Sequence, residues 1–408
     1  MNYKKITECR CCKNNNLIEI LNLNSQPLAN DYHNGLSVLD EYPLQLNLCS
    51  KCFHCQLSIA VFPDLMFKNY LYVSGTSNTL HEYFEWFADM VEKDINKVGS
   101  ILDIACNDGT QLSKFKNRGW KTFGIDPATN LINQSKENAD QIVLDYFNKD
   151  SIKKLSIKKF NVLVAQNVFA HVDNVEDFLL TCLDLMDDNT KLYIQTSQAD
   201  MIENNQFDTI YHEHLSFFST KSMKTLIERF NLKLLSVKRT HIHGTSYIFV
   251  ISKTGISDSS VEESLLQEEK NGRYNISRYD EYKKTIMFII DKFKNVIEEY
   301  KNKGYLIVGY GAAAKGNTFL NAAKVKLHYV IDDNKEKQNL LMPGSNSYIV
   351  DKSFINTFSN DVLFIPLAWN FYKEIKTNIN NQVNKLKFKN KFNYLIYSYY
   401  PNPIIEKI

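Results

Sequence analysis

The stretch Tyr211-His212-Glu213-His214 sets a phenol, two imidazoles and a carboxylate next to one another, between apolar residues on both sides. Imidazole, carboxylate and phenol groups are the side chains that move protons near neutral pH. The stretch therefore predicts general acid–base chemistry. A turn with a surface histidine pair is the alternative interpretation. The elements that position the stretch decide between the two.

A strand, a turn of small residues and a helix are expected earlier in the chain, over 100–104, 105–109 and 111–118. The next expected strand, 122–126, ends in the carboxylate of Asp126. This order is typical of a nucleoside-binding site, where small residues let the backbone approach the ligand and the acid accepts the ribose hydroxyls. A βαβ unit without a ligand is the alternative. The residues expected to bind the cofactor are Asp103, Ala105, Asn107, Gly109, Asp126 and Asn167.

The glycine pattern of NAD-binding enzymes is absent, since Ala105 and Asn107 stand where glycines are expected. The pattern's glycines let the backbone approach a pyrophosphate, so their absence disfavours such a ligand. It favours S-adenosylmethionine, whose nucleoside carries no phosphate.

Further strands are expected over 141–144, 161–166, 191–196 and 246–251, with a helix over 175–186. Strands that alternate with helices predict a parallel, doubly wound α/β sheet. His171 follows the fourth strand and Tyr211 to His214 follow the fifth, which places both at the carboxyl edge where such sheets bind ligands. For His171 alone, a buried structural histidine is the alternative.

Six of the eight cysteines lie within the first 55 residues. Two Cys-x-x-Cys pairs can close a tetrahedral Zn²⁺ site, and four thiolates would leave no position open for catalysis. The predicted metal ligands are Cys9, Cys12, Cys49 and Cys52. Cys11 and Cys55 complicate this ligand choice, His54 is a weaker candidate, and reduced buried thiols are the alternative. A small β-rich module is expected between Cys12 and Cys49.

In the last third, the order of strand, small-residue turn and helix is expected again over 305–318. A charged helical region is expected before it, over 259–303. Further strands are expected over 330–334, 362–366 and 392–397, which predicts a second small α/β domain. Lys315 beside the exposed amides of Gly311 to Gly316 is suited to a diphosphate, although a structural glycine turn would explain the pattern as well.

Composition bounds the possible functions. The 408 residues favour two or three domains, and a net charge of +2 gives no electrostatic case for nucleic acid or membrane binding. No run of about 18 apolar residues occurs, and the N-terminus lacks the apolar core of a signal peptide. A cytoplasmic location is the expectation.

Taken together, these residues resemble a known family, the three-domain S-adenosylmethionine-dependent sugar C-methyltransferases of the mycarose and tetronitrose pathways. The resemblance rests on rare motifs in the right order along nearly the whole chain. These are Cys9-Arg10-x-Cys12, Pro27-Leu28-Ala29-Asn30, Cys49-x-x-Cys52, 103–109, Tyr211 to His214, and 309–318. It implies a zinc-binding domain over 1–72, an S-adenosylmethionine domain over 73–255, and a helical linker with a Rossmann-like domain over 256–408. Asp126 in place of Glu, an altered loop at 342–348 and the extra thiol of Cys55 depart from the family pattern.

The family's activity implies methylation of a nucleotide-linked 4-keto-deoxysugar at C3, through an enolate. His214 is the expected base, Tyr211 the donor to the oxyanion, and Glu213 and His171 the groups that orient the imidazole or relay its proton. The residues expected to bind the nucleotide-diphosphate sugar are Asn30, Tyr32, Tyr72, Gly311, Lys315, Gly316 and Asn317. A sugar O-methyltransferase and a nucleotide-sugar-binding relative, non-catalytic or NAD-using, are the alternatives. The oligomeric state is left open.

Overall fold

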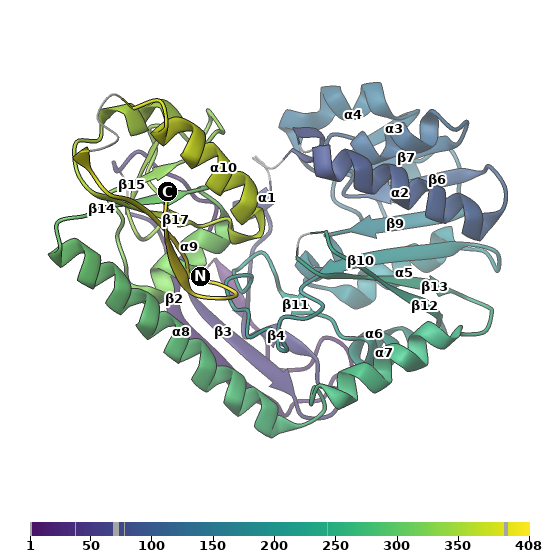
Figure 1. The fold of residues 1–408 in the computed structure, drawn as a ribbon. Helices are drawn as coiled ribbons and strands as arrows, with labels where there is room; N and C mark the ends of the chain where they lie inside the picture. Colours follow the sequence, from purple (N-terminus) through teal and green to yellow (C-terminus); the bar gives the residue numbers. More distant parts are fainter. Residues whose placement is uncertain (1, 37, 68–72, 77, 243, 387–390) are drawn as a thin grey trace. The chain divides into compact units, whose positions relative to one another are not determined.

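The computed structural model describes residues 2–36, 38–67, 73–76, 78–242, 244–386 and 391–408 (Figure 1). The chain forms two compact units. The first unit comprises Met1–Glu19, Asn47–Asp200 and Glu213–Ile276, and the second comprises Ile20–Leu46, Met201–His212 and Ser277–Ile408. The division into three domains at 72/73 and 255/256 stays a prediction.

A seven-stranded sheet, ordered β12-β13-β10-β9-β6-β7-β8, forms the centre of the first unit. Its strands are β6 (Ser100–Ile104), β7 (Lys121–Asp126), β8 (Gln141–Leu144), β9 (Val162–Gln166), β10 (Lys191–Ser197), β12 (Lys233–Thr240) and β13 (Ser246–Ser252). The parallel order predicted for β6 to β10 is confirmed. The strand predicted at 246–251 is β13, which runs antiparallel to both neighbours, and the edge strand β12 had not been predicted.

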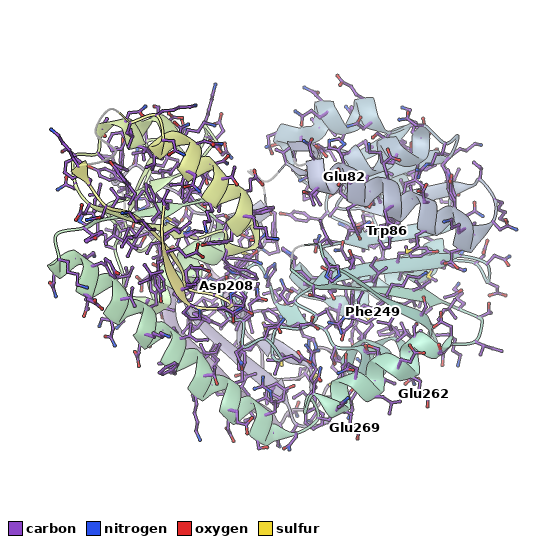
Figure 2. The ribbon with its side chains drawn as sticks, in the orientation of Figure 1. Glu82, Trp86, Asp208, Phe249, Glu262 and Glu269 are labelled. Atoms are coloured by element: carbon purple, nitrogen blue, oxygen red, sulfur yellow. The ribbon has the colours of Figure 1, made fainter. Side chains whose placement is uncertain are left out.

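Helices cover both faces of this sheet, as Figure 1 shows. They are α2 (Asn78–Ile95), α3 (Thr110–Lys116), α4 (Ile132–Asn138), α5 (Val175–Leu185), α6 (Thr220–Glu228) and α7 (Ser259–Lys270). Strand residues alternate between two cores: Val164 packs with α2 and α3, and Leu163 packs with α5 and α6. Phe249, labelled in Figure 2, faces the second of these cores from β13. Both faces are buried, as the apolar runs of a parallel sheet require.

The N-terminal region is β-rich, as predicted. Its strands are β1 (Tyr3–Lys5), β2 (Leu17–Pro27), β3 (Glu41–Cys49), β4 (Cys55–Leu57) and β5 (Ile59–Val61), followed by the short helix α1 (Asp64–Phe67). Strand β1 pairs with β5. Strand β11 (Ser216–Phe217) pairs antiparallel with β4, and the Leu57 N–H donates to the Leu215 carbonyl at 3.0 Å. The backbone directly after His214 is therefore fixed by the N-terminal region.

A six-stranded sheet, ordered β16-β15-β14-β17-β18-β19, lies in the second unit. Its strands are β14 (Leu306–Tyr310), β15 (Tyr329–Ile331), β16 (Tyr348–Val350), β17 (Val362–Pro366), β18 (Tyr394–Ser398) and β19 (Ile404–Lys407). Only β19 is antiparallel to its neighbour. Helices α9 (Ala314–Ala323) and α10 (Tyr372–Val383) follow β14 and β17. The predicted second α/β domain is confirmed.

The charged region predicted as one or two helices forms two, α7 and α8 (Ile276–Asn302), with Gly272 at a φ of 79° between them. The buried residues of α8 recur every three or four positions, the spacing of one helix face. In the second unit this face also holds the segment 201–212, since the Tyr282 hydroxyl donates to the Gln206 carbonyl at 2.6 Å. In the described part of the chain, no helix is both long and apolar enough to cross a membrane.

Candidate functional site

The four predicted cysteine ligands come together in the first unit. The Sγ atoms of Cys9 and Cys52 are 3.5 Å apart, as are those of Cys12 and Cys49, and all four lie within 4.8 Å of one another. A zinc ion with Zn–S bonds of about 2.3 Å needs sulfur atoms roughly 3.8 Å apart. The cluster thus fits a tetrahedral Zn²⁺ site.

Two matching turns present these thiols. Each Cys-x-x-Cys pair is followed by a residue in the left-handed region, Lys13 at a φ of 60° and Phe53 at 57°. The N–H of each donates back to the carbonyl of the first cysteine, Cys9 or Cys49. Among the described residues the cluster does not include Cys11, Cys55 or His54. His54 is buried beside Phe218, and burial lowers its pKa to about 4.

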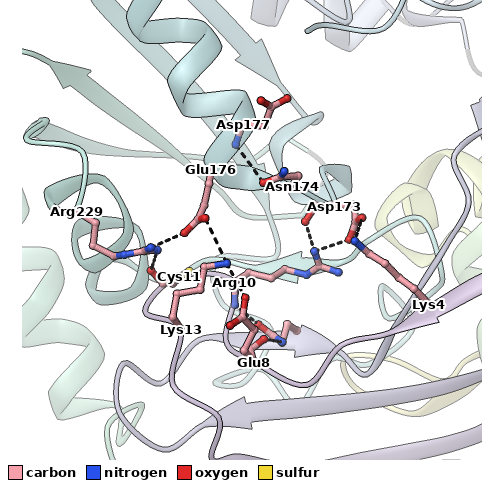
Figure 3. A network of polar contacts seen from close by, with 11 residues as sticks. Lys4, Glu8, Arg10, Cys11, Lys13, Asp173, Asn174, Glu176, Asp177 and Arg229 are labelled. Carbon is pink, nitrogen blue, oxygen red and sulfur yellow. Dashed lines mark hydrogen bonds and ion pairs between the residues drawn. The ribbon is translucent and has the colours of Figure 1, made fainter. Parts of the chain in front are cut away.

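An ion-pair network ties the cysteine cluster to the loop before α5 (Figure 3). Nη1 of Arg10, a residue between the ligands Cys9 and Cys12, lies 2.8 Å from a carboxylate oxygen of Asp173. Lys4 reaches the other oxygen at 2.5 Å. Arg229 donates to the Cys11 carbonyl at 2.8 Å. The sequence alone predicts no role for Arg10, because an arginine inside a Cys-x-x-Cys pair does not reveal its partner.

A cavity of about 350 Å³ opens at the carboxyl ends of β6, β7 and β9. Small-molecule sites in proteins occupy roughly 300–1,000 Å³. The predicted cofactor residues that line it are Asp103, Ala105, Asn107, Asp126 and Asn167. Gly109 does not belong to the described lining: a Cβ there would lie 2.9 Å from Asn138 Cβ, so the glycine allows α4 to pack closely. Tyr83, Phe84 and Tyr146 add aromatic surface.

The backbone of this cavity explains how it is built without the expected glycines. Ala105, Asn107 and Asn167 adopt left-handed conformations, with φ values of 61°, 53° and 53°. The two carboxylate oxygens of Asp126 accept the N–H groups of Asn107 and Ala128, each at 2.8 Å. The acid that ends β7 thereby holds the turn after β6.

Asp103 is the most perturbed acid of the cavity. Burial raises its pKa to about 8, while the Gln111 amide, which donates at 2.9 Å, opposes that rise. Gln166 in turn donates to Gln111. The raised pKa suits a carboxyl group that meets a cationic ligand, since a cation stabilises the charged form. Gln111 was not predicted, although its place in the first turn of the helix after the strand was a usable signal.

Two of the predicted catalytic histidines meet at the cavity. His171 lines it, and its ring meets the ring of His214 edge to face with centroids 4.9 Å apart. Burial lowers the pKa of His171 to about 4, so its imidazole is neutral at pH 7. The N–H of Leu215 donates to the Ala170 carbonyl at 2.8 Å, which fixes the two histidine-bearing segments to each other.

The stretch Tyr211 to His214 crosses the boundary between the units. Tyr211 and His212 belong to the second unit, and Glu213 and His214 to the first. The Nε2–H of His212 donates to the Tyr42 carbonyl at 3.1 Å, and burial lowers the pKa of His212 to about 4. This contact gives His212 a structural role.

Several predicted substrate-binding residues are brought together within the second unit. The Asn317 amide donates to the Ala29 carbonyl at 2.6 Å, and the Tyr32 hydroxyl donates to the Ala312 carbonyl at 2.6 Å. The loop that contains Asn30 is thus packed on the turn after β14. Tyr72 lies outside the described residues.

Gly311 in this turn and Gly316 in α9 also allow close packing. A Cβ at Gly311, whose φ is 89°, would lie 3.0 Å from Ala368 Cβ, and one at Gly316 would lie 2.8 Å from Leu367 Cβ. The Ala312 N–H donates to Asp332 at 2.6 Å, so this backbone amide of the turn already has a hydrogen-bond partner within the protein.

Lys315, near the start of α9, differs from its neighbours. Its Nζ is buried, has no hydrogen-bond partner among the described residues, and lies 5.1 Å from the centre of the Trp369 ring. The Trp369 indole N–H donates at 2.5 Å to Asp208, which is labelled in Figure 2. Burial lowers the pKa of Lys315, and the charge of Asp208 opposes that shift. Trp369 lies in the strand-end segment 366–370 that the sequence places beside the same crevice as Lys315, whereas Asp208 is not a predicted site residue.

Comparison with known proteins assigns three consecutive regions. A "Putative zinc binding domain" model matches residues 9–67, a "Methyltransferase domain" model matches 76–237, and a "C-methyltransferase C-terminal domain" model matches 241–388.

Individual relatives extend these matches. The chain is 25% identical to C-methyltransferase NovU of Streptomyces niveus. That alignment spans 393 residues and covers 92% of each chain. It is also 33% identical to a ubiquinone biosynthesis O-methyltransferase of Rhodopseudomonas palustris strain TIE-1. That alignment spans 88 residues, which are 21% of this chain and 35% of the relative. Among solved structures, the PH0226 protein of Pyrococcus horikoshii OT3 aligns with 16% identity and a TM-score of 0.35, over 48% of this chain and 97% of that one.

Proposed function

We propose that the chain, a methyltransferase that uses S-adenosylmethionine and binds zinc, methylates C3 of a nucleotide-linked 4-keto-deoxysugar. One observation carries the proposal: His171, on the wall of the cofactor cavity, is in ring contact with His214. A base is thereby available next to the place where a methyl group would be presented. The similarity to a C-methyltransferase over 92% of the chain supports carbon as the acceptor atom.

The proposed chemistry starts with the acidic C3 hydrogen beside the C4 carbonyl. His214 takes this proton through a neutral ring nitrogen, which is available near pH 7. The Tyr211 hydroxyl donates to the enolate oxygen that forms at C4. Glu213 and His171 orient the imidazole or relay its proton. Bound S-adenosylmethionine supplies an electrophilic methyl group, and its alignment with C3 provides much of the rate gain.

The proposed diphosphate contact is Lys315. A buried ammonium group without a hydrogen-bond partner is costly, and an anion removes that cost. Asn317 adds a buried side-chain oxygen that has no partner among the described residues and could accept a donor of the ligand. We assign Asn30, Tyr32, Gly311 and Gly316 to the same substrate site, together with Tyr72.

The experiment that tests the proposal uses a panel of nucleotide 4-keto-6-deoxysugars, labelled S-adenosylmethionine and deuterated water. The wild-type protein should exchange the C3 hydrogen and transfer the label to carbon with one member of the panel. His214→Ala and His214→Asn should lose both reactions, whereas His241→Ala, a change at an exposed histidine, should lose neither. Full C3 exchange in the His214 variants would assign the base to Tyr211 or His171 instead.

A second candidate is a sugar O-methyltransferase, which the 88-residue match to an O-methyltransferase favours. This reaction also needs a base but no ketone. Product analysis separates the two candidates, because the new methyl carbon would be bonded to oxygen, and C3 deuterium exchange would not accompany turnover.

A further inference from the structure

Gln198 is a buried glutamine directly after β10, at the same sheet edge as the cofactor cavity. Its φ of 68° lies in the left-handed region, which a glutamine seldom adopts. The neighbouring Ala199 is held on both sides: its N–H donates to the Thr245 carbonyl at 3.0 Å, and its carbonyl accepts from the buried Arg273. The surroundings thus impose a strained conformation that directs one side chain to a fixed place.

That side chain contacts the proposed base. The Nε2 atom of Gln198 lies 3.3 Å from Nδ1 of His214, and Oε1 has no hydrogen-bond partner in the described part of the chain. Rotation of the amide about its last bond exchanges these two atoms and brings Oε1 to Nδ1. We propose that Gln198 is a positioning residue, whose Oε1 accepts Nδ1–H of His214 and leaves Nε2 as the proton acceptor.

The chemistry of the imidazole favours this orientation. A neutral imidazole with its proton on Nδ1 can accept the substrate proton only at Nε2. After the transfer both ring nitrogens are donors, so the partner of Nδ1 must present an oxygen throughout the step. An amide oxygen meets this need without a formal charge. A carboxylate in its place would hold the imidazolium more tightly and would make the base charged at neutral pH.

The titratable residues beside His214 include His171 and Glu213. His171 faces the His214 ring from the segment after β9, and its pKa of about 4 leaves it neutral near pH 7. Glu213 precedes His214 in the chain. Phe217, whose ring centre is 6.3 Å away, carries no charge.

The test observes the ring nitrogens directly and needs no substrate. The full-length, zinc-loaded protein is labelled with ¹⁵N-histidine, and long-range ¹H–¹⁵N spectra are recorded across pH. Among the nine histidines, His214 is assigned by the signals missing from His214→Gln. The wild type should carry the neutral-state proton on Nδ1. Gln198→Glu should raise the pKa of His214 by at least about one unit, and Gln198→Met should shift the proton toward Nε2.

A wild-type proton on Nε2, or unchanged His214 signals in both variants, would overturn the inference. Gln198→Glu keeps the size of the side chain, so it remains informative even if Gln198→Met fails to fold. The catalytic meaning of the contact rests on the proposed function, but the tautomer does not. Absence of C3 exchange in a wild type with Nδ1 protonated would refute only the proposed function, and C3 exchange with Nε2 protonated would refute only the role of Gln198.

Discussion

The ring of His171 is perpendicular to the ring of His214, with an interplanar angle of 89° and centroids 4.9 Å apart. His171 reaches this position from the segment after β9, and His214 from the segment before β11. Two residues that are 43 positions apart in the numbering thus form one contact at the proposed cofactor cavity. Their energetic contributions should therefore be coupled.

We expect the two histidines to act as a unit. His214→Gln should lower kcat roughly 10²–10⁴-fold, the usual contribution of a general base. His171→Asn should cause a smaller loss, because it leaves the proposed base, His214, in place. The double variant should be no slower than His214→Gln alone, since an orienting group has no effect once the base is gone. Multiplicative losses in steady-state kinetics would show that the histidines act independently.

The raised pKa of Asp103 predicts proton release when the cofactor binds. Its pKa of about 8 means that most unliganded molecules carry this proton at pH 7. The ammonium and sulfonium groups of S-adenosylmethionine favour the carboxylate, so binding at pH 7 should release close to one proton. Calorimetric titrations in buffers of different ionisation enthalpy measure this number. Asp103→Asn should release none through this group, and equal heats in all buffers for the wild type would contradict the prediction.

The same group should affect the stability of the unliganded protein. The folded state holds the Asp103 proton more tightly than the unfolded chain does, since the pKa rises from 3.8 to about 8. Its contribution is therefore fully present below about pH 4 and is lost as pH rises toward 8. Denaturant melts between pH 5 and 8 should show a shallower decline for Asp103→Asn than for the wild type.

Ala105→Gly should stabilise the first unit. A non-glycine residue in the left-handed region raises the free energy of the folded state by about 1–2 kcal/mol. Glycine avoids this strain but loses more backbone entropy on folding, so the free energy of unfolding should rise by about 1 kcal/mol. Asn107→Gly is the matched comparison. Asparagine tolerates this region, and its side chain accepts the Ser74 N–H at 3.0 Å, so that change should destabilise. Urea unfolding of both variants measures the difference.

The contact between Arg10 and Asp173 should link the cysteine cluster to the cofactor cavity. Asp173 lines the cavity, and the Arg10 side chain is buried. Arg10→Met should destabilise the first unit by about 1–3 kcal/mol, because it leaves a half-buried carboxylate with one partner fewer. Zinc content should remain unchanged while S-adenosylhomocysteine binding weakens. Lys13→Met, at a more exposed residue of the same network, is the control and should change binding little.

Lys315→Met should separate substrate binding from cofactor binding. We expect an increase in KM for the nucleotide sugar of on the order of 10-fold or more, from the lost charge-assisted contact. Affinity for S-adenosylhomocysteine should stay constant. The thermal midpoint should not fall, because the substitution removes a buried ammonium that lacks a hydrogen bond. An unchanged KM would exclude Lys315 from the diphosphate site.

Much of the first unit followed from the sequence because its signals are local. The strand–turn–helix order around 100–126, the paired cysteines and the acid of Asp126 are read from neighbouring residues, and the structure brings them to a cavity and a cluster. The antiparallel β13 was not distinguishable from a parallel strand, since period and length do not encode direction.

Contacts between distant segments did not follow from the sequence. Nothing near Gln198 indicates His214, and nothing near Asp208 indicates Trp369, since each pair meets only through tertiary packing. The left-handed conformations at 105 and 107 were also not predictable, because glycine is the usual sequence signal for them and neither residue is a glycine.

The interleaved order of the two units has a consequence for synthesis on the ribosome. The segment Ile20–Leu46 emerges early, yet its unit is complete only after Ser277–Ile408 has been made. Leu21, Leu44 and Leu46 of this segment are buried in the folded protein, whereas most of their unit has not yet been made at that stage. Apolar side chains of this segment therefore remain without most of their unit during much of translation, a state that favours chaperone binding. A gene truncated before codon 277 should yield aggregates rather than a free-standing cofactor-binding half.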